Sequence, residues 1–202
     1  MKKIYMLSIK ENNMSSQCFT FMVKYGWLAI FIVYSGSVFV PWVPRSWQPP
    51  CNNSWVLVLH DAFIRRLGFG TDVVFTFGPY GFLYYGAIPQ TYLVTLLGWL
   101  LISVGYVIAV WKAFDTSHFP NWAKMLFALL VTVVSASLDV VDAQVFVFVA
   151  FASVAWIFSK PKSIVCNVLV GTALALTSLV KFSWFIAIAP CVVTLTVLGV
   201  MR

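Results

Sequence analysis

The sequence contains very little charge. Only 9% of its 202 residues are charged, and only six of them are acidic. A soluble globular domain carries roughly 25% charged residues. Because 61% of the residues are hydrophobic and the mean hydropathy is +0.93, the composition excludes an ordinary soluble domain. It predicts an integral membrane protein whose first partner is the lipid bilayer.

The absence of certain other motifs excludes further classes of protein and of binding site. The four cysteines form no CxxC pair, so neither a disulfide framework nor a zinc site is predicted. The net charge is +7, but there is no basic run beyond Lys2-Lys3 and Arg65-Arg66. This pattern indicates topology signals and no nucleic-acid partner. The glycine-containing stretch 70–83 lacks a GK[ST] ending, so it is not predicted to be a phosphate-binding glycine loop.

Long apolar segments separated by short polar gaps predict an all-α fold, a polytopic transmembrane helix bundle with about six spans. A span needs about 20 apolar residues. The block 164–200 is long enough for two short helices with Lys181 at the turn between them. The other predicted spans are 25–43, 91–111, 125–138 and 143–158.

The distribution of lysine and arginine predicts the orientation. With a cytoplasmic N-terminus, nine of these residues lie inside and four outside, and cytoplasmic segments carry the excess. The four outside are Arg45, Arg65, Arg66 and Lys181. We therefore expect a single transmembrane domain over 1–202 in a bacterial inner membrane. Its tail 1–24 would be cytoplasmic and its long loop 44–90 extracytoplasmic.

The long loop is predicted to contain a helix that lies in the membrane interface. Residues 55–69 have helical length, but they are too short and too charged to span a bilayer. Tryptophan and phenylalanine along the segment, with arginine near one end, are typical of an interfacial helix. A longer helix is broken by glycines and prolines, namely Gly68, Gly70, Gly78, Gly81, Gly86, Pro79 and Pro89. The stretch after Gly70 is predicted to be a re-entrant or surface-hugging loop.

This loop contains candidate functional side chains. Asp61 can act as a general base if burial raises its pKa or a substrate hydroxyl reaches it. The alternative is a surface carboxylate paired with Arg65, four residues along the same helix face. Arg65 and Arg66 can clamp a phosphate, or they can contact lipid. His60 is a further candidate for substrate binding, with a plain interfacial polar residue as its alternative.

Two other charged sites lie at the edges of spans. Asp139 and Asp142 flank a tight gap, and carboxylates there are costly unless they are solvated, paired or metal-bound. The alternative is that both aspartates simply end helices, with Asp142 favourable at a helix N-terminus. Lys181 interrupts an apolar block, where it can snorkel to the interface or neutralise an anionic lipid headgroup.

Four features of the layout occur together in a known family. The long loop places Asp61 after the first span, and Asp142 opens the fourth span in Asp142-Ala-Gln-Val-Phe-Val-Phe. The last hairpin reads Leu179-Val-Lys-Phe-Ser-Trp with Pro190 beyond it, and the loop contains FTFGPYGFL. In these features the chain resembles the N-terminal part of GT-C type glycosyltransferases, polytopic enzymes that use polyprenyl-phosphate sugars.

The resemblance implies transfer of a sugar from a polyprenyl-phosphate donor to a hydroxyl acceptor on the outer face. Asp61 would be the general base. Asp142, with Asp139 or Asp72, would orient the substrate or hold a divalent metal ion. The residues that would contact substrate and stabilise the lipid-phosphate leaving group are Arg65, Arg66 and Lys181, with His60 beside them.

Enzymes of this type usually have more than six spans, so we expect the chain to be the N-terminal part of a larger enzyme or a small relative. The rival interpretation is a non-enzymatic membrane protein, either a transporter fragment or an assembly subunit. A transporter should carry ionisable groups or broken helices at mid-membrane. Here the charges lie at the edges of the spans, with Lys181 the one candidate exception, which favours the enzyme or a scaffold.

Overall fold

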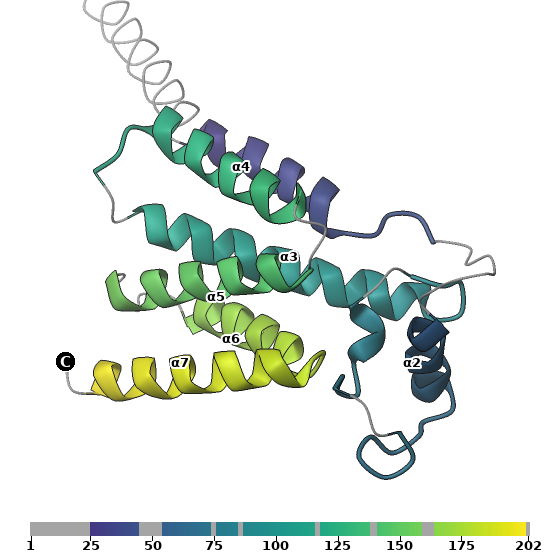
Figure 1. Cartoon of the computed structure of the whole chain (residues 1–202). Helices are drawn as coiled ribbons and strands as arrows, with labels where there is room; N and C mark the ends of the chain where they lie inside the picture. Colours follow the sequence, from purple (N-terminus) through teal and green to yellow (C-terminus); the bar gives the residue numbers. More distant parts are fainter. Residues whose placement is uncertain are drawn as a thin grey trace, which may run out of the picture.

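The computed structural model describes residues 25–44, 54–73, 76–84, 87–115, 118–137, 141–158 and 164–200. Within these ranges every regular element is a helix, which confirms the prediction of an all-α fold (Figure 1). The elements are the helix Tyr25–Phe39, α2 (Ser54–Ile64), the 3-10 helix η1 (Gly81–Leu83), α3 (Tyr92–Asp115), α4 (Asn121–Ser137), α5 (Val141–Phe158), α6 (Ile164–Ser178) and α7 (Phe182–Val200).

The apolar segments predicted from sequence all form helices, in the same order. The block 164–200 divides into α6 and α7 around a turn at 179–181, as expected from the position of Lys181. Among the described helices, α3, with 24 residues, is the one long and apolar enough to cross a membrane by itself, and the other apolar helices are shorter. An apolar helix of this length fits membrane association, and the count of six spans stays a prediction.

Helix α3 lies at the centre and packs against α5 and α6. Its contact with α6 is close because Gly105 has no side chain. A Cβ atom at Gly105 would come 2.5 Å from the Cβ of Ala173. Small residues at such a crossing allow two backbones to approach, as they do in membrane helix pairs.

The helix Tyr25–Phe39 packs antiparallel to α3. Near one end, the rings of Trp27 and Phe114 meet edge to face with centroids 6.3 Å apart. Beyond the other end, the hydroxyl of Tyr92 donates a hydrogen bond to the carbonyl of Trp42, 2.6 Å away. Between them, Phe31 contacts Tyr106 with centroids 5.9 Å apart.

Successive long helices alternate in direction, so the connections gather at two ends of the bundle. One end, which we call the Asp142 end, holds α2, η1 and the first residues of α5 and α7, joined by contacts between Tyr84, Asp142 and Lys181. At the opposite end, Lys112 of α3 donates a 2.7 Å hydrogen bond to Asn167 of α6. The Asp142 end therefore carries the described parts of the predicted loop 44–90.

The bundle presents much apolar surface. Large hydrophobic side chains are exposed on the helix Tyr25–Phe39, α4, α6 and α7, among them Val33, Phe127, Leu130, Val165, Ile186 and Val193. Large apolar side chains that are exposed in this way are candidates for an interaction surface. These faces suit contact with lipid.

Helix α2 lies beside the Asp142 end and runs across the direction of α3 and α7 in the view of Figure 1. Val56, Leu59 and His60 are buried on its inner side. The outward side carries exposed Leu57 and Val58 together with charged residues. The helix ends at Ile64, earlier than the predicted 55–69, because the next residues form a tight turn.

Candidate functional site

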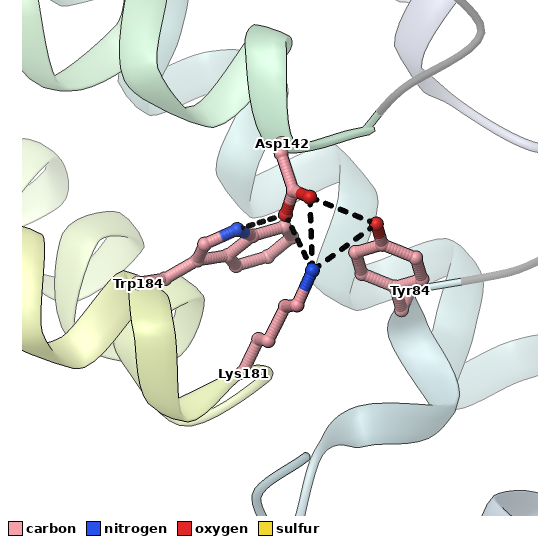
Figure 2. A network of polar contacts seen from close by, with 4 residues as sticks. All are labelled: Tyr84, Asp142, Lys181 and Trp184. Carbon is pink, nitrogen blue, oxygen red and sulfur yellow. Dashed lines mark hydrogen bonds and ion pairs between the residues drawn. The ribbon is translucent and has the colours of Figure 1, made fainter. Parts of the chain in front are cut away.

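An ion pair between Asp142 and Lys181 lies at the centre of the candidate site (Figure 2). The Nζ atom of Lys181 lies 2.8 Å from Oδ2 and 3.0 Å from Oδ1 of Asp142. Asp142 is in the first turn of α5, and Lys181 is in the turn that precedes α7. The side chain of Lys181 is 20% exposed and that of Asp142 is 25% exposed. The pair is therefore partly shielded from solvent but still accessible to a ligand.

Two aromatic side chains complete the contacts of this carboxylate. The hydroxyl of Tyr84 donates a 3.1 Å hydrogen bond to Oδ2 of Asp142. The indole N–H of Trp184 donates to Oδ1. The ammonium of Lys181 also reaches the Tyr84 hydroxyl at 3.4 Å. Three donors from two distant chain segments thus hold one carboxylate, and such charge-assisted hydrogen bonds are stronger than neutral ones.

Aromatic rings surround the ammonium group of Lys181. Its Nζ lies 4.7 Å from the ring centroid of Tyr84 and 5.6 Å from that of Phe77. Both distances allow cation–π attraction. Phe77 meets Tyr84 edge to face at 4.8 Å and stacks on Trp55 of α2 at 5.1 Å. The site therefore combines a carboxylate, an ammonium and an aromatic wall that extends to α2.

The backbone explains how the loop segment 76–84 reaches Lys181. Gly78 N–H donates to the carbonyl of Val180 at 3.0 Å, and Phe182 N–H donates to the carbonyl of Thr76 at 2.9 Å. These bonds flank an antiparallel bridge between Phe77 and Lys181. The approach requires glycine at position 78, because a Cβ atom there would lie 2.2 Å from the carbonyl oxygen of Leu179.

The charge states of the site follow from these contacts. Burial by itself lowers the pKa of Lys181, but its hydrogen bonds to Asp142 and Tyr84 outweigh burial and raise the pKa above its ordinary value. Burial, and next the charge of Asp142, raise the pKa of the Tyr84 hydroxyl. At neutral pH Lys181 is therefore charged and Tyr84 remains a proton donor.

Asp61, the predicted general base, lies on the outward side of α2. Its Oδ1 accepts a 2.8 Å hydrogen bond from Nε of Arg65, and the two side chains are 51% and 68% exposed. The surface pairing considered as an alternative is thus present, and Asp61 is also accessible to an acceptor. His60 points the other way: it is fully buried, with Nδ1 2.7 Å from Oγ1 of Thr91, and joins α2 to the start of α3.

The remaining predicted residues are dispersed. Arg66 is exposed in the turn after α2. Asp72 is exposed and accepts a 2.8 Å hydrogen bond from Gly68 N–H, which closes a tight loop. Asp139 lies outside the described residues. Of the predicted site residues, the structure therefore brings together Asp142 with Lys181 and Asp61 with Arg65.

The predicted divalent metal ion was assigned to Asp142 and Asp139, and Asp139 lies outside the described residues. No group of three or more histidine, cysteine, aspartate or glutamate side chains that could hold a metal occurs among them. The oxygens of Asp142 already accept from Lys181, Trp184 and Tyr84. Among the described residues, the cation that contacts both oxygens of this carboxylate is the ammonium of Lys181.

Sequence reasoning did not assign a role to Tyr84 or Trp184. A signal was present, because Trp184 closes the stretch Leu179-Val-Lys-Phe-Ser-Trp and Tyr84 directly follows FTFGPYGFL. Neither residue had been assigned a donor role from the sequence. Comparison with family models, curated proteins and solved structures found no match to the chain.

Proposed function

We propose that this chain is a polytopic membrane glycosyltransferase of GT-C type, acting alone or as part of a larger enzyme. It would transfer a sugar from a polyprenyl-phosphate donor to a hydroxyl acceptor on the outer face of a bacterial inner membrane. The observation that carries the proposal is the convergence of three separate segments of the resemblance at one place. Phe77 and Tyr84, Asp142, and Lys181 with Trp184 form a single cluster of contacts.

The membrane arrangement in this proposal has six spans: the helix Tyr25–Phe39 and α3 to α7. Its supports are the alternating direction of these helices and their exposed apolar side chains. At about 1.5 Å per residue, the 19 residues of α7 extend about 28 Å, close to the ~30 Å hydrocarbon core. With a cytoplasmic N-terminus, the Asp142 end and α2 lie on the outer side.

In the proposed reaction each residue has one defined role. The acceptor oxygen attacks the anomeric carbon of the sugar, the bond from that carbon to the phosphate oxygen breaks, and the polyprenyl phosphate leaves with the bonding electrons. Asp61 takes the proton of the attacking hydroxyl. Lys181 stabilises the phosphate, for which its ammonium turns from Asp142 toward the ligand, and Arg65 and Arg66 provide additional positive charge.

A non-enzymatic scaffold, such as an assembly subunit, is a second candidate because one observation favours it. Asp142 and Lys181 already satisfy each other, with support from Tyr84 and Trp184. A closed pair of this kind can serve as a structural clamp between α5 and α7. The two candidates differ in whether the chain moves a sugar.

The experiment that tests the proposal is a transfer assay with the full chain in membrane vesicles. A panel of labelled polyprenyl-phosphate hexoses is supplied as donors, with nucleotide sugars as a comparison class and vesicles lacking the protein as the blank. The proposal predicts protein-dependent movement of label from at least one polyprenyl-phosphate donor into an acceptor. Absence of transfer from every donor, with the protein folded and inserted, would replace the enzyme by the scaffold.

A further inference from the structure

Arg66 occupies a backbone position that usually belongs to glycine. Leu67 N–H donates to the carbonyl of Ala62 at 2.9 Å, and Arg66 N–H donates to that of Phe63 at 3.2 Å. This pair of bonds is the Schellman ending of a helix, in which the left-handed residue is usually glycine. Arg66 takes this place with φ of 56°.

The left-handed conformation carries a cost for any residue with a Cβ atom. Gly68 and Gly70 follow closely in the sequence, yet the left-handed position itself is occupied by Arg66. A non-glycine residue held in this region is a reason to ask what its side chain does. The question is therefore which group the guanidinium of Arg66 contacts.

The neighbouring charged side chains have other hydrogen-bond partners. Arg65 pairs with Asp61 at 2.8 Å, and Asp72 accepts a hydrogen bond from Gly68 N–H at 2.8 Å. For Arg66, no side-chain hydrogen bond or ion pair to another described residue is found. Residues 54–67 thus carry two arginines and one aspartate, a net charge of +1, while Asp72 keeps its negative charge in the loop that follows.

Apolar side chains flank this net positive charge. Leu57, Val58, Ile64 and Leu67 are exposed on or just after α2. A helix with exposed apolar residues and a basic end is suited to the boundary between headgroups and acyl chains. Anionic lipid phosphates are complementary to the guanidinium of Arg66, and each basic residue near such a surface adds attraction.

We propose that the outward side of α2 docks on the lipid surface and that Arg66 binds the phosphate of an anionic lipid headgroup there. The occupant is the membrane that surrounds the chain, with no contribution from a soluble phosphate. This inference rests on membrane residence and does not depend on sugar transfer. It gives Arg66 a lipid ligand in addition to the positive charge that it contributes in the proposed reaction.

The test uses the full chain in nanodiscs of phosphatidylcholine, with or without added phosphatidylglycerol. The variants are Arg66→Gly, which relieves the left-handed backbone; Arg66→Asn, which tolerates it without charge; and Arg65→Gln as the matched neighbour control. Thermal unfolding gives Tm in each lipid, and native mass spectrometry counts the phosphatidylglycerol retained. Inorganic phosphate added to phosphatidylcholine discs separates a free anion from a headgroup.

In phosphatidylcholine, Arg66→Gly should unfold at the same temperature as the wild type or a few degrees higher. Added phosphatidylglycerol should raise Tm of the wild type and of Arg65→Gln, but not of Arg66→Gly or Arg66→Asn, and those two should retain less of it. An equal Tm gain in all four proteins would overturn the proposal. The proposal would also be overturned if inorganic phosphate raised Tm as much as phosphatidylglycerol does. The same holds if Arg65→Gln lost as much of the Tm gain and of the retained phosphatidylglycerol as the Arg66 variants. These outcomes do not decide the sugar-transfer proposal, which is tested separately with labelled polyprenyl-phosphate donors.

Discussion

Asp142 and Lys181 are 39 residues apart in the sequence, yet the Lys181 ammonium lies within 3.0 Å of both carboxylate oxygens of Asp142. The pair joins the start of α5 to the start of α7. Through Tyr84 it also fixes the loop segment 76–84 against both helices. The stability of the Asp142 end should therefore depend on this contact.

Removing one partner of the pair should cost more than removing both. Lys181→Met leaves a half-buried carboxylate without its main counter-charge, which should cost about 2 kcal/mol of unfolding free energy. The double variant Asp142→Asn/Lys181→Met should recover part of that loss, because the uncompensated charge is gone. Thermal unfolding in detergent micelles measures the stability of the single and the double variant.

Arg65→Met is the matched control, since it makes the same kind of change in a solvent-exposed pair. Its cost should be well below about 1 kcal/mol. Equal losses for Arg65→Met and Lys181→Met would show that the partial burial of the Asp142–Lys181 pair has no consequence for stability.

The contribution of Lys181 to the stability of the folded chain should persist into alkaline pH. The folded pKa of Lys181 is raised, so its stabilisation is fully present below the ordinary lysine value of about 10.4 and is lost as pH rises through the folded pKa. The Tm difference between wild type and Lys181→Met should thus be constant from about pH 7 to about pH 10. A difference that already shrinks between pH 8 and pH 9, about two units below the ordinary lysine value, would mean that the pKa is lowered.

Gly78→Ala should detach the loop segment 76–84 from the turn before α7. The new Cβ atom would lie 2.2 Å from the Leu179 carbonyl oxygen, a backbone atom that cannot move alone. We expect a loss of at least about 1–3 kcal/mol and faster proteolysis within the loop. Gly171→Ala in α6 is the control, because nothing lies within 4 Å of its added Cβ and alanine favours a helix. Equal tolerance of both substitutions would argue against the bridge between Phe77 and Lys181.

The sequence predicts the helices well because long apolar runs dictate them. It also places a turn at Lys181, since one cation inside a largely apolar block of 37 residues marks a break. The end of α2 was missed: Gly68 and Gly70 suggested a later stop, whereas the left-handed residue is Arg66.

The contact partners of the site follow from tertiary packing, which the sequence alone does not display. Lys181 was predicted as an isolated charge that meets lipid or phosphate, but packing of α5 against α7 brings Asp142 to it. Tyr84 and Trp184 resemble any other interfacial aromatics until their donor atoms are seen to face one carboxylate. The burial of His60 is likewise set by packing, because α2 turns that side toward Thr91.

The proposed orientation places the loop on the outer side and the gap between α3 and α4 on the inner side. In a cysteine-free background, Thr71→Cys should react with an impermeant thiol reagent in intact cells, since position 71 is exposed. His118→Cys, also at an exposed position, should react only after the cells are opened. The reverse pattern would invert the orientation and place the Asp142 end in the cytoplasm.

The most direct measurement of the central claim compares sugar transfer by wild type, Asp61→Asn and Asp115→Asn at matched protein level in membranes. Both aspartates are exposed, and Asp115 ends α3 at the opposite end of the bundle. A general base contributes typically about 10²–10⁴-fold to a rate. We therefore predict a loss of about that size for Asp61→Asn and near wild-type transfer for Asp115→Asn. Equal activity in both variants would contradict the assignment of Asp61, and a wild type that moves no sugar from any polyprenyl phosphate would contradict the enzyme itself.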